Sequence, residues 1–283
     1  MATLKRSQYG KHRVRVLKLL RSPDGRHDVC ELEVNVLLTL SKDPSFESDD
    51  NSLIVPTDTV RNTVNVLAHD HLLTCRHAFA RVIGRHFLSS YEHVSSVDVT
   101  LTERAWTRMS TGGTPHTHAF SHNANGNPVT MGVFARGAQE YLRGGLKDCL
   151  VMKTTESSFT GYHLCELTTL PPVEDRIFAT RIHAEWTFVP DTPDAALAGT
   201  DVMIHDAMMA VFADTHSPSV QRTLFLMGEA ALAAVPCIES VTLKLPNVHF
   251  LNVDLSKVGR PDQRKVFLPT DEPHGQIEAT ITR

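Results

Sequence analysis

The segment Val55-Pro56-Thr57-Asp58-Thr59-Val60-Arg61-Asn62-Thr63 marks the place where the first strands give way to a helix. Thr57 is the expected helix N-cap, because its hydroxyl can accept a hydrogen bond from a free first-turn N–H. Asp58 suits the positive end of the helix dipole. A helix N-terminus also favours anions. The segment therefore indicates either an ordinary capped helix or a docking point for an acidic, planar ligand.

Alternating sequences before this segment predict a β-hairpin. Residues 12–20 begin with valines on one side and arginines on the other, which is the period of a strand with one wet face. The alternation is interrupted at Leu17 and Lys18, which predicts a bulge or a change in the covered face. A turn at residues 22–25 leads to a second alternating strand over residues 28–40.

The rest of the chain repeats one order of elements. The spacing of apolar residues predicts helices at 58–68, 75–91, 201–215 and 218–234, and strands at 94–109, 116–136, 138–154, 176–189, 238–245, 249–255 and 276–282. A turn at residues 123–127 is expected to interrupt the segment 116–136. The stretch at 138–154 reads as a strand pair or as a single strand. The order ββααββ thus occurs twice, so we expect an α+β chain of two tandem domains, residues 1–137 and 138–283. Each is expected to be an antiparallel sheet with helices on one face.

Composition argues against several classes of protein. The 283 residues carry a net charge of −4, so nucleic-acid binding is not expected. No apolar run approaches the ~18 residues that span a bilayer, so no membrane association is expected. Five scattered cysteines without C-x-x-C spacing read as reduced thiols of a cytoplasmic protein. The chain ends Ile281-Thr282-Arg283 rather than in a Ser-Lys-Leu peroxisomal address, which also favours the cytoplasm.

Motifs for common cofactors are not found in the sequence. It contains no G-x-G-x-x-G, no Walker lysine loop, no H-E-x-x-H and no G-x-S-x-G. His116, His118 and His122 have a spacing that metals use, but no carboxylate or cysteine lies within several residues of them. We therefore expect hydrogen-bonded histidines near a strand end and no metal site.

Several polar or aromatic residues lie at the ends of predicted elements, where they suit a small ligand. An aromatic ring, an arginine fork and a glutamine amide together suit a flat nitrogen heterocycle, by stacking and paired hydrogen bonds. The residues concerned are Lys11, Phe159, Arg176, Gln221, Asn247 and His249.

Six motifs, in this order and spacing, resemble the urate oxidase (uricase) family. They are Tyr9-Gly10-Lys11, Val55-Pro56-Thr57-Asp58-Thr59, Lys153-Thr154-Thr155-Glu156-Ser157-Ser158-Phe159, Thr168-Thr169-Leu170 with Asp175-Arg176-Ile177, Ser219-Val220-Gln221, and Leu245-Pro246-Asn247-Val248-His249-Phe250. The closing Gly275-Gln276-Ile277-Glu278-Ala279-Thr280-Ile281 also fits. Together these motifs extend over the whole chain.

The resemblance implies two tandem tunnelling-fold domains, assembled as a tunnel-shaped homotetramer with active sites between subunits. It implies oxidation of urate by O2 and water to 5-hydroxyisourate and hydrogen peroxide in purine catabolism, with no metal and no organic cofactor. Arg176 and Gln221 would grip the urate ring with bidentate hydrogen bonds, Phe159 would stack on it, and the backbone of Val220 would add a contact.

The resemblance also implies roles for residues from elsewhere in the chain. Thr57 and Asp58 would reach the substrate from the neighbouring subunit, and Asn247 would hold O2 or water above the ring. Lys11, Thr57 and His249 would form a proton relay, because a lysine screened from water can act as a base and a hydroxyl can pass on the proton.

Two positions depart from the family pattern, and two other functions are compatible with the fold. Val248 replaces a commonly basic residue, and Glu156 a commonly small polar one; neither has an assigned role. A tunnelling-fold enzyme for another purine or a pterin would use a glutamate anchor, and Arg176 with Gln221 argues against it. A non-catalytic purine binder or scaffold would not need the relay.

Overall fold

The computed structural model describes residues 3–72, 75–123, 125–260, 264–270 and 272–283. The chain forms two compact units. Unit 1 comprises Met1–Leu146, Trp186–Asp201 and Cys237–Glu239, and unit 2 comprises Lys147–Glu185, Val202–Pro236 and Ser240–Arg283. The expected domain boundary between residues 137 and 138 stays a prediction.

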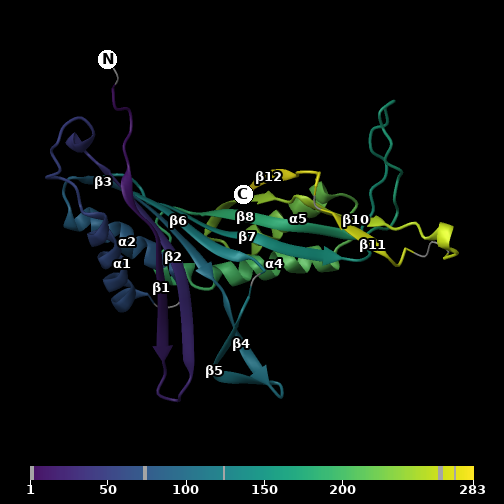
Figure 1. Cartoon of the computed structure of the whole chain (residues 1–283), viewed down its shortest axis with the longest axis horizontal. Helices are drawn as coiled ribbons and strands as arrows, with labels where there is room; N and C mark the ends of the chain where they lie inside the picture. The colour runs from purple at the N-terminus through teal and green to yellow at the C-terminus, as the bar shows by residue number, and fades with distance from the viewer. Residues whose placement is uncertain (1–2, 73–74, 124, 261–263, 271) are drawn as a thin grey trace. The chain divides into compact units, whose positions relative to one another are not determined.

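Unit 1 is built on an antiparallel sheet in the order β1-β2-β3-β6. The strands are β1 (Tyr9–Arg21), β2 (His27–Leu40), β3 (Val94–Arg104) and β6 (Asn127–Ala135). Helix α1 (Thr57–His71) packs against β1, and α2 (Arg76–Ser90) packs against β3 and β6 (Figure 1). The inward residues of β2, which are Leu32, Val34, Val36 and Leu38, are at most 1% exposed. This confirms the alternation predicted for that strand.

The irregularity in β1 lies earlier than the sequence predicted. Its pairing with β2 shifts between Lys11 and Val14, and Arg13 there has a φ of 58°. The register is continuous past Leu17, whose side chain is 60% exposed, so the bulge expected at this point is wrong. Lys18 faces the helix instead and donates to the carbonyl of Ala68 near the end of α1, at 3.2 Å.

The expected strand at 94–109 is divided, and the break expected within 116–136 is confirmed. Residues 94–109 form β3 and then β4 (Trp106–Thr111), and residues 116–136 contribute β5 (Thr114–His122) and β6. Among the residues that the structure describes, β4 and β5 pair only with each other, and they extend away from the main sheet as a hairpin (Figure 1). Alternation along a strand reports which face is covered, but not which strand is its partner, so the sequence could not show the division of 94–109 or the pairing of β4 with β5.

Unit 2 contains further antiparallel strands. They are β9 (Ile238–Lys244), β10 (Asn247–Asn252), β11 (Phe267–Thr270) and β12 (Glu278–Thr282), with parts of β7 (Tyr141–Lys153) and β8 (Phe178–Phe188). Strand β10 pairs with β8 and β11, and β12 pairs with β9. Residues 141–153 are one strand and not a pair, and β11 was not predicted.

The helices of the second half are α3 (Asp194–Leu197), α4 (Thr200–Asp214) and α5 (Val220–Ala234), and short 3-10 turns occur at Pro44–Phe46 and Ser256–Val258. Helix α5 packs against β12. A Cβ at Gly228 would come within 2.6 Å of the Ile281 side chain, so the helix and the strand approach as closely as a glycine permits.

By length and composition alone, the helical stretch Asp194–Asp214 could cross a membrane, which corrects the expectation that no stretch approaches that length. Core helices of folded proteins pass the same test. Two of its carboxylates are held by ion pairs: Asp194 pairs with Arg81, and Asp201 pairs with Arg76.

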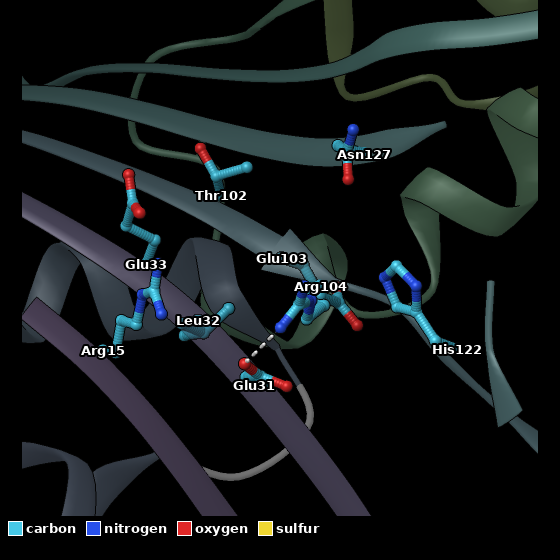
Figure 2. Close-up of a pocket in the computed structure, with 9 residues that line it drawn as sticks. All are labelled: Arg15, Glu31, Leu32, Glu33, Thr102, Glu103, Arg104, His122 and Asn127. Carbon is cyan, nitrogen blue, oxygen red and sulfur yellow. Dashed lines mark ion pairs between the residues drawn. The ribbon is translucent and has the colours of Figure 1, made fainter. Parts of the chain in front are cut away.

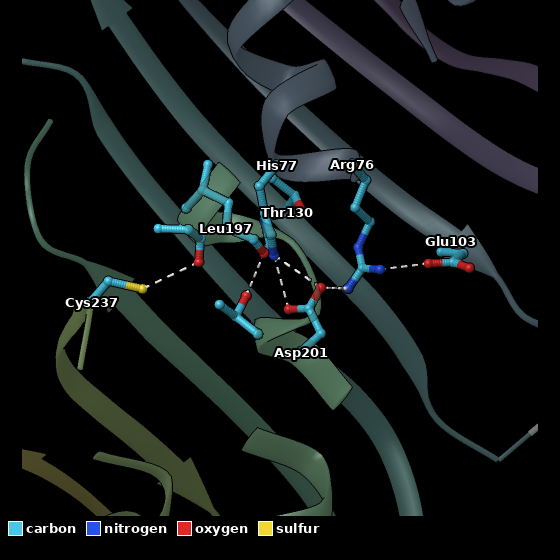
Figure 3. A network of polar contacts seen from close by, with 9 residues as sticks. Arg76, His77, Glu103, Thr130, Leu197, Asp201 and Cys237 are labelled. Atoms are coloured by element: carbon cyan, nitrogen blue, oxygen red, sulfur yellow. Dashed lines mark hydrogen bonds and ion pairs between the residues drawn. The ribbon is translucent and has the colours of Figure 1, made fainter. Parts of the chain in front are cut away.

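A polar network joins the start of α2 to Asp201 (Figure 3). His77 is 1% exposed, its Nε2 lies 2.9 Å from both carboxylate oxygens of Asp201, and its Nδ1 lies 2.8 Å from the Thr130 hydroxyl. Arg76 bridges Asp201, at 2.8 Å, and Glu103, at 2.6 Å. Each buried charge therefore has a partner of opposite sign, as burial requires.

Candidate active site

Phe159 is held in a short antiparallel bridge with Val173. The Phe159 amide donates to the Val173 carbonyl at 2.7 Å, and the Val173 amide donates back at 3.0 Å. The half-buried ring stacks on Tyr162, with centroids 4.8 Å apart and planes at 16°. The Tyr162 hydroxyl donates to the carbonyl of Leu170. The aromatic side chain is thus fixed by its backbone and by a second ring.

Arg176 lies beside this ring. Its central guanidinium carbon is 5.2 Å from the centroid of Phe159, and its amide donates to the carbonyl of Ser157 at 2.8 Å. Burial lowers the pKa of Arg176. Its buried Nε has no hydrogen-bond partner among the described residues. Because an unpaired buried donor is costly, a planar acceptor next to Phe159 would satisfy it.

The N-terminus of α5 approaches the same segment. Ser219 is the N-cap, and its hydroxyl accepts from the Arg222 amide at 3.2 Å, so the predicted helix start is confirmed. Just before it, the Ser217 carbonyl accepts from the Ser158 amide at 2.8 Å. Val220 is 3% exposed, whereas Gln221 is exposed in the first turn. The Ser217 amide also donates to the Glu156 carbonyl at 2.9 Å, so two backbone hydrogen bonds connect the Phe159 segment with the helix that carries Gln221.

Asn247 and His249 both lie on β10. Asn247 is opposite Thr180 of β8, and its amide donates to the Gly275 carbonyl at 2.9 Å, while His249 is opposite Thr270 of β11. Asn247 and Val248 line a cavity of about 480 Å³ that Arg181 and Lys244 also line. This cavity lies wholly within unit 2, and its wall carries both charges, because Glu272 and Glu278 also line it and Lys244 forms an ion pair with Glu278 at 3.1 Å.

Lys11 sits in unit 1 at the irregular point of β1, opposite Val36. The preceding Gly10 is required by close packing, since a Cβ there would lie 1.9 Å from the Val36 carbonyl oxygen. Tyr9 belongs to the first family motif but had no predicted role, and its hydroxyl accepts from the Val55 amide at 2.8 Å. The motif Tyr9-Gly10-Lys11 therefore anchors the chain that leads into α1.

Thr57 is the first residue of α1 and not its N-cap. The cap position is Pro56, whose carbonyl accepts from the Val60 amide at 3.0 Å, and no side chain caps the helix. The expectation that the Thr57 hydroxyl caps the helix is therefore wrong. Proline suits this place because it gives up no amide hydrogen bond. Thr57 and Asp58 are exposed, and Asp58 forms an ion pair with Arg61 at 2.7 Å.

The structure brings some of the predicted site residues together. Phe159 and Arg176 are in contact, and Val220 and Gln221 follow a loop bonded to the Phe159 segment. Asn247 and His249 belong to the same unit, on another strand. The remaining predicted residues, Lys11, Thr57 and Asp58, belong to unit 1. The sequence assigned no role to Tyr9 or Tyr162, because a positioning contact leaves no mark in local spacing.

A second cavity, in unit 1, has a different character. It measures about 310 Å³ and is lined by side chains of both charges, including Arg15, Glu33 and the pair Glu31–Arg104 at 3.6 Å (Figure 2). None of the predicted site residues lines it. Its charges already face one another, so it is a poor match for a single planar anion.

The predicted histidine cluster has local hydrogen-bond partners. The Nδ1 of His116 accepts from the backbone amides of His118, at 3.2 Å, and Ala119, at 3.0 Å. The rings of His116 and His118 meet edge to face, 4.6 Å apart. Among the described residues, no group of three or more His, Cys, Asp or Glu side chains has the arrangement of a metal site.

Comparison with known proteins gives one consistent result. The family model described as Uricase matches residues 7–131 and 142–278. Over 98% of this chain and 94% of its own length, a uricase of Oryctolagus cuniculus is 39% identical. A uricase of Dictyostelium discoideum is 36% identical over 100% of this chain and 98% of its own length.

Solved structures agree in fold. A crystal structure of uricase from Arthrobacter globiformis superposes with a TM-score of 0.91 at 31% identity, covering 100% of this chain and 96% of that one. A urate oxidase mutant of Bacillus sp. TB-90 superposes with a TM-score of 0.84 at 21% identity, covering 98% and 99%, and shows the fold alone. The expected antiparallel α+β architecture is thereby confirmed.

Proposed function

Because the chain belongs to the uricase family, we propose that it oxidises urate with O2 and water to 5-hydroxyisourate and hydrogen peroxide, using neither a metal nor an organic cofactor. The observation that carries this proposal is the pairing of Arg176 with Phe159. A guanidinium with a buried, unpartnered Nε beside an aromatic ring is suited to a flat anion that stacks and accepts two hydrogen bonds.

Binding is assigned to one group of residues in unit 2. Phe159 supplies the stacking face, and Arg176 and Gln221 supply hydrogen bonds to acceptors and donors on the edge of the urate ring. The Val220 backbone adds a further contact at the start of α5. Arg176 also stabilises the negative charge that grows on urate when a proton is removed.

We assign the proton transfers and the reaction with O2 and water to a second group of residues. Lys11 removes a proton from urate through the Thr57 hydroxyl, which leaves a ring rich enough in electrons to reduce O2. Two electrons and two protons convert O2 to hydrogen peroxide, and water adds to the oxidised ring to give 5-hydroxyisourate. Asn247 holds O2 and then water above the ring, and His249 exchanges protons during the hydration.

The proposed assembly is a homotetramer whose active sites lie between subunits, with Thr57 and Asp58 supplied by the neighbouring chain. Their exposure at the start of α1 is consistent with a role towards another molecule. The positive end of that helix would face the anionic substrate. We also propose a cytoplasmic location, which the free thiols of Cys30, Cys75, Cys149 and Cys165 favour.

The test is a urate assay on purified protein in the presence of a metal chelator. We expect loss of the ultraviolet absorbance of urate, with one hydrogen peroxide formed per urate consumed. Activity only after metal is added, or no activity, would overturn the proposal. Xanthine and a dihydropterin serve as matched alternative substrates, and faster turnover of either would favour a different tunnelling-fold enzyme.

A further inference from the structure

We propose that His216 is a positioning residue of this site, which fixes the distance between the segment that carries Phe159 and the helix start that carries Val220 and Gln221. It does so through Ser158 and Glu156. The inference rests on the proposed function, because it concerns how the two halves of the urate-binding group are held together.

His216 precedes the helix start, and its side chain contacts two residues of the segment that carries Phe159. Its Nε2 lies 3.1 Å from the Ser158 hydroxyl, and its Nδ1 lies 3.3 Å from a carboxylate oxygen of Glu156. Next to it in the chain, the Ser217 carbonyl accepts from the Ser158 amide at 2.8 Å, and the Ser217 amide donates to the Glu156 carbonyl at 2.9 Å. Side chain and backbone therefore form two parallel connections between the same segments.

The side-chain connection works in either protonation state of the imidazole. A carboxylate only accepts, so Nδ1 carries the proton towards Glu156, whereas the Ser158 hydroxyl can donate to Nε2 or accept from it. A neutral or a charged His216 therefore satisfies both partners. Such a contact suits a fixed spacer better than a pH-dependent switch.

The conformation of Glu156 supports a specific purpose for this contact. Its φ is 57°, in the left-handed region that is unfavourable for a residue with a Cβ. Glycine or asparagine would adopt this backbone more easily. The hydrogen bond from His216 gives a reason for a glutamate here, and it bears on the expectation that Glu156 adjusts the packing beside Phe159.

The order carboxylate, imidazole, hydroxyl is also that of a hydrolase triad, but the surroundings of Ser158 do not suit a nucleophile. The amides of Ser158 and Phe159 donate to the carbonyls of Ser217 and Val173, so neither can stabilise an oxyanion. Ser158 is also only 8% exposed. The arrangement therefore points to alignment of neighbouring residues.

Alignment predicts a particular kinetic effect. Urate must contact the Phe159 ring and the Gln221 amide at the same time. A looser connection between the two segments that carry these residues therefore weakens substrate binding. The residues of the relay, Lys11, Thr57 and His249, make none of the contacts described for His216. Loss of His216 should therefore raise KM and leave kcat largely unchanged.

The experiment measures urate kinetics and peroxide yield for five variants of the full-length protein beside the wild type. For His216→Ala we expect KM to rise about tenfold, with kcat within about twofold. His216→Gln keeps an amide near the position of Nε2, so its KM should lie between the KM of the wild type and that of His216→Ala. Ser158→Ala should raise KM, and adding it to His216→Ala should have little further effect.

His205→Ala is the matched control, because His205 on α4 also pairs with an acid, Asp206, at 3.1 Å, and its side chain is 44% exposed against 48% for His216. This control should keep the wild-type KM. Amide hydrogen exchange gives a second readout, and it should become faster at residues 157–159 and 217–221 only in the His216 and Ser158 variants.

Two outcomes would overturn the inference while leaving the proposed function intact. One is an active His216→Ala variant with wild-type KM and exchange. The other is equal damage by His216→Ala and His205→Ala, which would indicate a general loss of stability. A wild-type protein that does not consume urate would instead overturn the proposed function itself, and with it the alignment role.

Discussion

The guanidinium of Arg176 lies over the ring of Phe159, with its central carbon 5.2 Å from the ring centroid. Both residues are held by backbone hydrogen bonds to neighbouring segments, Phe159 to Val173 and Arg176 to Ser157. A planar charge and an aromatic face are thus presented together before any ligand arrives. Such preorganisation lowers the cost of binding, since the protein has little to rearrange.

Removing this charge should act mainly on substrate binding. For Arg176→Ala we expect KM for urate to rise roughly 10- to 100-fold, which corresponds to the loss of a charged hydrogen bond. Arg176→Lys should recover only part of this, because an ammonium cannot form two parallel bonds. Steady-state kinetics would test both variants, and an unchanged KM in Arg176→Ala would contradict the assigned role.

Residues of the relay should act on turnover. Lys11→Met and Thr57→Ala are expected to lower kcat by roughly 10²- to 10⁴-fold, the usual range for a positioned acid or base. Binding of a non-reactive urate analogue, measured by calorimetry, should change far less. Thr57→Ser keeps the hydroxyl and is the matched control. If it loses as much activity as Thr57→Ala, the hydroxyl is not the group that matters.

If sites are shared between subunits, two impaired variants should restore each other's activity. In Arg176→Ala the damage lies in unit 2, and in Thr57→Ala it lies in unit 1. Co-expressed chains with different tags, purified as mixed oligomers, should form some sites with Thr57 from one chain and Arg176 from another. We expect urate oxidation to return in the mixed sample. Mixed oligomers without activity would place both residues of a site on one chain.

The Tyr9 hydroxyl should support the stability of the fold. Tyr9→Phe removes the acceptor of the Val55 amide, and Val55 is only 3% exposed. We expect the free energy of unfolding to fall by about 1–3 kcal/mol, the cost of a buried amide left without a partner. Urea unfolding would measure it. Tyr162→Phe is the control, because it shows how much the free energy of unfolding falls when a tyrosine hydroxyl is lost away from the contact between Tyr9 and Val55.

Asp201 should make stability depend on pH. Burial raises the pKa of Asp201, but the charge of Arg76 and the hydrogen bond from His77 outweigh it and hold the pKa below its usual value. The contribution of the ionised group is therefore present above the unfolded-state pKa of about 3.9 and is lost as the pH falls through the lower, folded value.

Asp201→Asn should accordingly destabilise the protein by about 3 kcal/mol at neutral pH, because Arg76 loses a buried partner. The difference from wild type in urea unfolding should be constant from pH 7 to about pH 5 and should shrink below about pH 4. Asp206→Asn removes an exposed acid of the same helix and is the control. A difference that stays constant below pH 4 would show that the ionised carboxylate is not the source.

The periodicity of apolar residues in the sequence was enough to predict most helices and strands. Alternation at residues 28–40 predicted β2 and its buried face, and the helical spacing at 75–91 predicted α2 to within one residue at each end. The failures share one cause. The β4–β5 hairpin, the exposed Leu17 and the cap at Pro56 depend on what each segment packs against, and a one-dimensional pattern does not contain that information.

By itself, the sequence determined the types of the elements, the repeated order of strands and helices, and the motifs that mark the family, because these depend on residues close to one another in the chain. Only the tertiary structure decided that His216 meets Ser158, 58 residues away, and that the Val55 amide meets the Tyr9 hydroxyl, 46 residues away. Such contacts arise when buried surfaces pack together, and a hydrogen bond then forms wherever packing leaves a donor facing an acceptor.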